Sequence, residues 1–213
     1  MGFNFGVLPT VLFKPKEAFK SLGSQTIKEG AILAVVFAGV SSAIGGILGG
    51  QFNVLFWVIA AVMGAVIVVA TGWLAAQMAK IVFKGSGNVP NTVGYLAYGQ
   101  VLGVVSAIVG GVLGMLGMGM MGSVTPANAL AMAGGALGVA AIVGLVFTLW
   151  SLYIMGAAVG VANGIRVLFG AVCALVAGLI VGTIVGMIFG IIFAMLGLGA
   201  MMGAGAAAAG ALG

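Results

Sequence analysis

The chain has 213 residues, of which 63% are hydrophobic and only 4% carry a formal charge, with a net charge of +5. A soluble domain carries roughly 25% charged residues, so this composition excludes a water-soluble globular protein. Several apolar runs, rich in Val, Ile, Leu and Phe, exceed the ~20 residues that cross a bilayer. The sequence therefore predicts an integral membrane protein, rather than a fibrous chain built on its 40 glycines.

The first segment, residues 1–30, is expected to be cytoplasmic or interfacial. Pro15 suits the first turn of a helix and Gly23 suits its end. Phe19 and Leu22 fall on one face of this segment, and Lys16 and Lys20 fall on another. This pattern predicts a short amphipathic helix lying in the membrane interface, with a solvated linker as the alternative.

Five apolar runs follow, and we expect them to form a five-span helical bundle in one domain over residues 1–213. The predicted spans are about 31–50, 54–80, 92–116, 129–162 and 167–196. The fourth run is longer than one span needs, so it tilts, protrudes or begins with a separate interfacial piece. Residues 197–213 are expected to form a tail rich in Gly, Ala and Met on the outer side of the membrane.

The loop at residues 80–91 orients the whole bundle. It interrupts the apolar sequence with two lysines and a Gly-Ser-Gly-Asn-Val-Pro cluster that ends one helix and starts another. Under the five-span arrangement all seven basic residues fall on one side, namely Lys14, Lys16, Lys20, Lys28, Lys80, Lys84 and Arg166. Because basic loops stay in the cytoplasm, this predicts the N-terminus inside and the C-terminus outside.

Small residues recur every four positions in the fifth run. They are Gly170, Ala174, Gly178, Gly182, Gly186, Gly190 and Ala194. Such a ridge lets a second backbone approach closely, which matters in lipid because little hydrophobic force draws helices together. We expect Gly178, Gly182, Gly186 and Gly190 to pack inside the bundle, and a homodimer surface is the alternative.

The titratable residues exclude most chemistry. The chain has no His and no Asp, and its two acids, Glu17 and Glu29, lie near the basic loops. No carboxylate pair, nucleophile–base pair or His-based metal site can be assembled, so we expect no enzyme activity, no cofactor and no metal. The basic residues are spread over three short segments, which is typical of membrane orientation rather than nucleic-acid binding.

Three polar residues inside the spans are candidates for a function, namely Gln100, Thr71 and Thr148. Gln100 lies ten residues after Pro90, so about 15 Å into the membrane. A hydrogen bond to a neighbouring helix is the favoured role for Gln100, and a substrate-facing role is the alternative.

Two methionine-rich segments, 115–122 and 195–203, are expected on the uncharged side. Clustered thioethers bind Cu(I) or form an adaptable apolar contact surface, and the lack of nearby Cys and His favours the second.

Several short motifs resemble the Yip domain family of Ypt/Rab-interacting multi-pass membrane proteins, in particular its prokaryotic members. They are Lys14-Pro15-Lys16-Glu17-Ala18-Phe19, Phe83-Lys84-Gly85-Ser86-Gly87, Val93-Gly94-Tyr95-Leu96-Ala97-Tyr98-Gly99-Gln100, Leu149-Trp150-Ser151-Leu152 and Gly156–Gly164. The resemblance implies five spans and a cytoplasmic N-terminus, with the cell membrane as the site if the chain is prokaryotic. Through the eukaryotic members it implies binding of prenylated small GTPases and a role in vesicle traffic or membrane shaping.

Three functional hypotheses follow from these observations. The first is a non-enzymatic scaffold or adaptor of the Yip type, whose basic side meets a cytoplasmic protein or anionic lipid. The second is a passive transporter or channel for a small neutral solute, lined by Gln100, Thr71 and Thr148. The third is a structural subunit of a larger membrane complex, in a homo- or hetero-oligomer.

Overall fold

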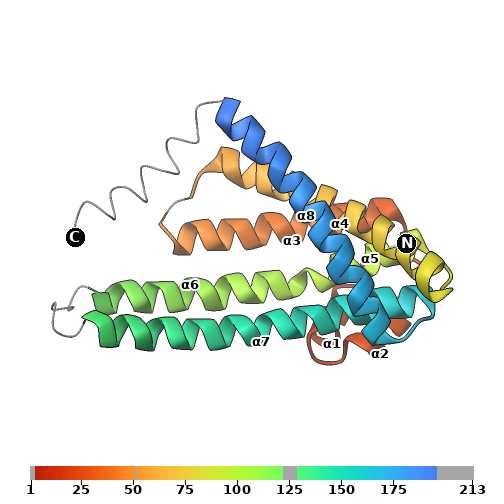
Figure 1. Ribbon diagram of the computed structural model, residues 1–213, viewed down its shortest axis with the longest axis horizontal. Helices are drawn as coiled ribbons and strands as arrows, with labels where there is room; N and C mark the ends of the chain where they lie inside the picture. Colours follow the sequence, from red (N-terminus) through yellow and green to blue (C-terminus); the bar gives the residue numbers. More distant parts are fainter. Residues whose placement is uncertain (1–2, 51, 122–128, 196–213) are drawn as a thin grey trace.

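Five long apolar stretches form the body of the protein (Figure 1). The computed structural model describes residues 3–50, 52–121 and 129–195, and within them it leaves out the side chains of 116–140, 189–190 and 192–195. The helices are η1 (Phe5–Val7), α1 (Leu8–Phe13), α2 (Pro15–Ser21), α3 (Ile27–Leu48), α4 (Val54–Phe83), α5 (Val89–Gly99), α6 (Val101–Met121), α7 (Ala129–Asn163) and α8 (Val167–Met195). Five stretches of the described chain are long and apolar enough to cross a membrane, which confirms a multi-pass helical membrane protein.

The first two long helices begin where polar side chains cap their free N–H groups. The Thr26 hydroxyl accepts the Glu29 N–H at 3.1 Å while the Glu29 carboxylate accepts the Thr26 N–H at 3.0 Å, a reciprocal cap. Helix α3 therefore starts at Ile27, four residues before the predicted span. The Asn53 side-chain oxygen likewise caps α4 by accepting the N–H of Leu55.

The third predicted span is two helices with a break at Gln100. The Gln100 N–H bonds to the Ala97 carbonyl, and the Gln100 carbonyl accepts the Gly103 N–H at 2.8 Å. Both bonds join residues three apart, so one tight 3₁₀-like turn separates α5 from α6. The sequence prediction of a continuous helix missed this break. Residues 89–115 still form one apolar stretch that is long enough to span.

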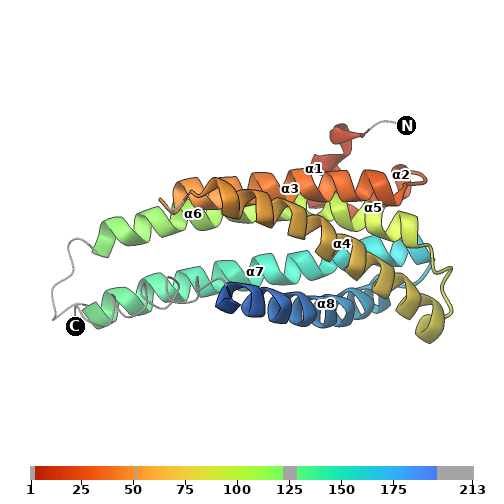
Figure 2. The same cartoon turned by 90° about the horizontal axis from the view of Figure 1, so that it is seen from above.

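Helix α7 runs without interruption for 35 residues, which corresponds to about 52 Å. This continuity excludes the separate interfacial piece considered for the fourth run. Helices α6 and α7 both extend past the end of α3 (Figures 1 and 2). The length is accommodated by tilt or protrusion, as expected for a helix longer than the bilayer core.

Glycines set the closest approach between α7 and α8. A Cβ on Gly170 would meet the Gly156 carbonyl oxygen and lie 2.7 Å from the amide nitrogen of Gly160. A Cβ on Gly156 would in turn lie 2.7 Å from the carbonyl oxygen of Val167. The two backbones are therefore in direct contact, the small-residue packing expected of helices in lipid.

The rest of the glycine ridge on α8 does not pack as predicted. A Cβ on Gly178, Gly182 or Gly186 would meet no described atom within 4 Å, and the surroundings of Gly190 lie outside the described residues. The reason is the helical repeat. Four residues turn an α-helix by about 400°, so a strict four-residue ridge drifts by about 40° per step. By Gly186 it has moved roughly 160° from Gly170, onto another face.

The residues of α8 that are buried follow the 3.6-residue period instead. They are Gly170, Cys173, Ala174, Ala177 and Val181. This face contacts α7 and α4, as the tertiary contacts show. The intramolecular packing role predicted for the ridge is thus correct at Gly170 and wrong at Gly178, Gly182 and Gly186.

The predicted amphipathic helix exists as α2, but protein covers its apolar face. Ala18 and Phe19 are fully buried, and the Phe19 ring stacks on Tyr95 of α5 with ring centroids 5.4 Å apart. Helix α2 also packs against α7. The predicted helix is therefore present, and its apolar face packs on α5 and α7, a contact that the one-dimensional pattern does not reveal; its position in the membrane interface stays a prediction.

Candidate functional site

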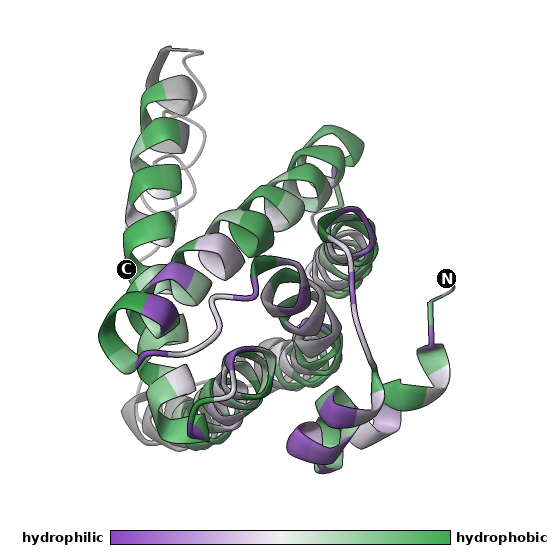
Figure 3. Ribbon diagram, turned by 90° about the vertical axis from the view of Figure 1, so that its right-hand side faces the viewer, coloured by the Kyte–Doolittle hydropathy of each residue, from purple (hydrophilic) through white to green (hydrophobic). Residues whose placement is uncertain are grey.

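The polar segments gather at one end of the bundle, which we call the basic end. It comprises residues 14–29, 80–91 and 163–166, and the hydropathy colouring shows hydrophilic residues concentrated there (Figure 3). All seven basic residues lie on it with exposed side chains, namely Lys14, Lys16, Lys20, Lys28, Lys80, Lys84 and Arg166. The basic residues that the sequence predicts to share one side of the membrane thus also lie at one end of the folded bundle.

Few of these cations are neutralised within the described chain. Lys14 lies 3.7 Å from the Glu17 carboxylate, and both side chains are about 70% exposed. The Glu29 carboxylate is engaged in the cap of α3. No other ion pair forms among the described residues, so the basic end keeps a net positive charge, whose attraction for an acidic partner weakens as salt is added.

Buried Asn163, at the C-terminal end of α7, holds the loop of the basic end in place. Its side-chain nitrogen donates to the Thr92 hydroxyl and to the Val159 carbonyl, each at 2.9 Å. Its side-chain oxygen accepts the N–H of Asn88 at 2.9 Å, and its main-chain oxygen accepts the N–H of Ser86 at 3.0 Å. Asn163 is 1% exposed, so these bonds replace the water it loses on burial.

A second set of bonds joins the α2–α3 connection to the same loop. The Gln25 N–H donates to the Asn91 side chain at 2.7 Å, and the Tyr95 hydroxyl donates to the Gly23 carbonyl at 2.8 Å. The Asn91 N–H is in turn bonded to the Asn88 side chain. Three segments far apart in the sequence therefore form one ordered surface.

Sequence reasoning assigned no role to Asn163, Thr92 or Asn88. A signal was present, because Asn163-Gly164 and Gly87-Asn88 are both turn pairs, and Gly87 and Gly164 adopt positive φ of 67° and 69°. The sequence marks these positions as turns. It gives no indication that one asparagine would bond to residues more than seventy positions away.

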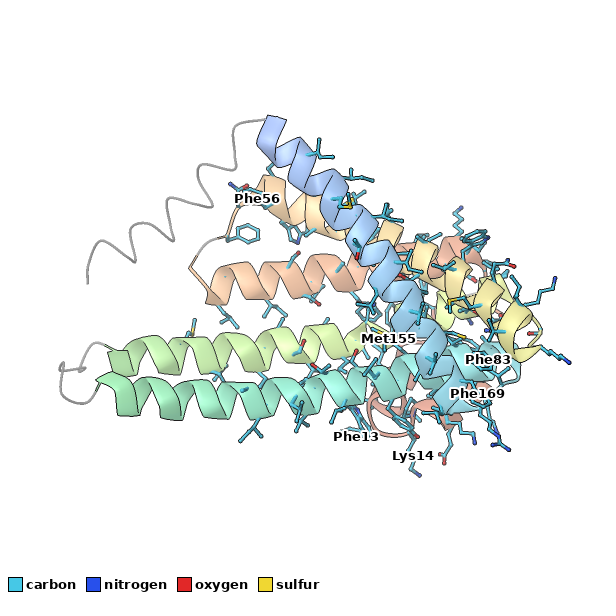
Figure 4. All side chains as sticks on the ribbon, viewed as in Figure 1. Phe13, Lys14, Phe56, Phe83, Met155 and Phe169 are labelled. Carbon is cyan, nitrogen blue, oxygen red and sulfur yellow. The ribbon has the colours of Figure 1, made fainter. Side chains whose placement is uncertain are left out.

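Apolar side chains are exposed beside the cations of the basic end. Ile81 and Val82 of α4 and Leu168 of α8 are more than half exposed. The rings of Phe83 and Phe169 stack at 4.6 Å and fix the ends of α4 and α8 to each other (Figure 4). Cations next to exposed apolar groups fit the boundary between lipid and water, where long basic side chains reach the aqueous side.

The three intramembrane polar candidates do not converge. Thr148 is exposed on α7 and its hydroxyl donates to Gly144 of its own helix at 2.8 Å. The Thr71 hydroxyl is buried on α4, and no described residue forms a hydrogen bond with it. Gln100 is half-buried at the α5–α6 break, and the interhelical hydrogen bond predicted for its side chain does not form among the described residues. The described structure therefore contains no shared polar path through these three residues.

The methionine-rich segments 115–122 and 195–203 lie almost entirely outside the residues whose side chains are described. Their proposed contact or Cu(I) role stays a prediction. Within the described ranges, no three His, Cys, Asp or Glu residues come together as metal ligands would. The one cysteine, Cys173, is free and buried in α8.

The fold and its charged end define a class, a helical multi-pass membrane protein with five candidate spans. The chain belongs to the Yip1 domain family, since the family model for the Yip1 domain matches residues 10–181. This family is associated with Rab proteins and vesicle trafficking, and its members are generally non-enzymatic. Comparison with curated proteins and with solved structures found no match. The prokaryotic type suggested by the motifs stays a prediction.

Proposed function

We propose that this protein is a non-enzymatic membrane adaptor whose basic end recruits a cytoplasmic protein with an acidic surface. One observation carries this proposal: the basic end presents seven exposed cations, and only Lys14 has a carboxylate partner among the described residues. Membership of a family linked to trafficking supports it. In the eukaryotic members that the motifs resemble, the partner class is the prenylated small GTPases, and such a GTPase is the first partner to test.

The rigidity of the basic end supports a docking role. Because Asn163 hydrogen-bonds to Ser86 and Asn88, the backbone of the loop that carries Lys84 is already ordered and loses less freedom when a partner binds. Positive charge on a fixed surface also speeds association with an acidic partner. The same reasoning requires the basic end to face the cytoplasm, in line with the positive-inside bias.

The recruitment test is a pull-down of the full-length chain from mild detergent with mass spectrometry of the captured proteins. The variant carries Lys16→Glu, Lys20→Glu, Lys80→Glu and Lys84→Glu, and the matched control carries Arg at the same four positions. We expect the Arg control to capture the partner and the Glu variant to lose it, with salt weakening capture by the unmodified chain. Equal capture by both variants contradicts the proposal. Binding only to anionic vesicles would replace the protein partner with lipid.

Orientation is tested separately by single-cysteine labelling in intact cells. Ser24→Cys reports the basic end and Asn53→Cys reports the opposite end, while the native Cys173 is buried. A membrane-impermeant maleimide should label position 53 in intact cells and position 24 only after lysis. The reverse result would place the basic end outside and rule out recruitment from the cytoplasm.

A further inference from the structure

A groove of about 610 Å³ opens between α8 and the halves of α3 and α4 that lie away from the basic end. Met63 and Ile67 of α4 line one side, and Gly182 and Gly186 of α8 line the other. Figure 4 shows Phe56 at the start of α4, where this region begins, and Phe83 at the far end, where α4 and α8 meet. Helices α4 and α8 therefore contact each other at the basic end, and the groove lies between them toward the opposite end of the bundle.

On α8 the groove is lined by Val185 and by the backbone of Gly182 and Gly186. A Cβ at Gly182 or Gly186 would meet no atom within 4 Å, so no described group of this chain fills the space beside these glycines. In a membrane such a space does not stay empty, because its apolar lining would lose its dispersion contacts on one side. The occupant is either lipid or a protein helix.

The length of the groove matches one leaflet. It starts at Asn53, which caps the first turn of α4, and reaches Ile67 fourteen residues later, about 21 Å along the helix axis. One leaflet of a ~30 Å hydrocarbon core is about 15 Å deep, and a tilted groove of this length covers that depth. The groove thus runs from the membrane surface to about the midplane.

The volume favours a single chain of methylenes over a helix. A membrane-spanning helix, ~10 Å wide and ~30 Å long, occupies more than about 2,000 Å³, several times the volume of the groove. No charged residue lines it, and Asn53 at its mouth is neutral. This lining recognises an acyl chain by shape and burial of methylenes, and offers no charge to select a headgroup.

We propose that this groove binds one acyl chain of a phospholipid from the leaflet opposite the basic end. The chain lies against Gly182 and Gly186, with the headgroup at Asn53. Burial of methylenes against protein on several sides holds this lipid longer than lipids on the convex surface of the bundle. The site is independent of the recruitment proposed for the basic end.

The experiment uses the full chain in nanodiscs of phosphatidylcholine that contains a diazirine on one acyl chain. After illumination, mass spectrometry compares labelling of residues 59–67 with labelling of the exposed face of α7, which includes Ile142 and Leu149. In the double variant Gly182→Leu with Gly186→Leu, the Cβ atoms meet no described atom within 4 Å, and the rest of each side chain extends into the groove. The matched control is Gly144→Leu on α7, where a Cβ also meets no described atom within 4 Å and which does not line this groove.

We expect residues 59–67 to carry several times the label of the α7 face in the unmodified chain and in the control. In the double variant that excess should vanish while the label on α7 is unchanged. Phosphatidylglycerol with the same chain should give the same pattern. Labelling that is equal on both surfaces, or unchanged in the double variant, overturns the proposal. So does a lack of lipid label at residues 59–67, which would assign the groove to another occupant, such as a helix of a second copy or partner.

Discussion

The contact between α7 and α8 can be tested with one substitution placed at two positions of the same helix. Gly170→Ala puts a methyl group 2.7 Å from the Gly160 nitrogen and against the Gly156 carbonyl oxygen. Both neighbours are backbone atoms, so no side chain can rotate away and the helices must separate. Overpacking of this kind costs about 1–3 kcal/mol of unfolding free energy.

Gly182→Ala is the matched control, since its methyl group meets no atom within 4 Å. Both variants replace Gly by Ala within α8, and both gain helix propensity of up to ~1 kcal/mol. That gain cancels when the two are compared. The control should therefore be as stable as the unmodified chain or slightly more stable, and Gly170→Ala should be less stable than the control by about 1–3 kcal/mol.

The assay is equilibrium unfolding by SDS in dodecyl maltoside micelles, followed by the far-UV circular dichroism and tryptophan fluorescence of each purified variant. A lower midpoint for Gly170→Ala alone supports the arrangement of the two helices. Equal midpoints for the two variants, or a lower midpoint for Gly182→Ala alone, would refute the reasoning that the four-residue ridge leaves the α7 contact as it winds around α8.

Three further results are expected. Asn163→Ala leaves the Asn88 N–H without its buried acceptor and should lower the unfolding free energy by about 2–4 kcal/mol. The control Thr148→Ala changes an exposed residue that bonds only to its own helix, and it should change the unfolding free energy by less than ~0.5 kcal/mol. Equal effects of the two substitutions would contradict the hydrogen-bond network of Asn163. Phe19→Ala should cost about 3–5 kcal/mol of docking energy and free α2 for tryptic cleavage at its lysines, and a protected α2 would argue against docking. Lys84→Gly should raise the midpoint of SDS unfolding, because Lys84 has a φ of 55°. This left-handed conformation costs a non-glycine residue about 1–2 kcal/mol. A lower midpoint for the variant would contradict the prediction.

Local patterns in the sequence locate most of the helices. The runs beginning near Val54, Ala129 and Val167 coincide with α4, α7 and α8, because length and hydropathy are enough to identify a membrane helix. The capping residues Thr26 and Asn53 also carry local signals, although the predicted first span begins four residues late. The break at Gln100 carries no strong signal, since neither proline nor a charged residue marks it.

The candidate site likewise has features that the sequence predicts and features that only the folded chain shows. Loop charge alone groups all seven cations on one side of the membrane, and the folded chain holds them at one end of the bundle. The role of Asn163 is beyond prediction, because its partners Thr92 and Asn88 come from another helix and loop. The groove is also beyond prediction, because the spacing of Gly182 and Gly186 predicts a contact between helices instead.

The sequence by itself determined that this is a multi-pass membrane protein with five candidate spans, and its loop charges predict which loops share a side. Those properties follow from the free energy of transferring single residues or short runs from water to lipid. They do not depend on which other helices lie beside a segment in the folded protein. Only the tertiary structure decided which faces meet. The angle between a four-residue repeat and the α-helical repeat grows with every turn of the helix. It increases by about 40° in each four-residue step, which moves Gly186 away from the contact that Gly170 makes.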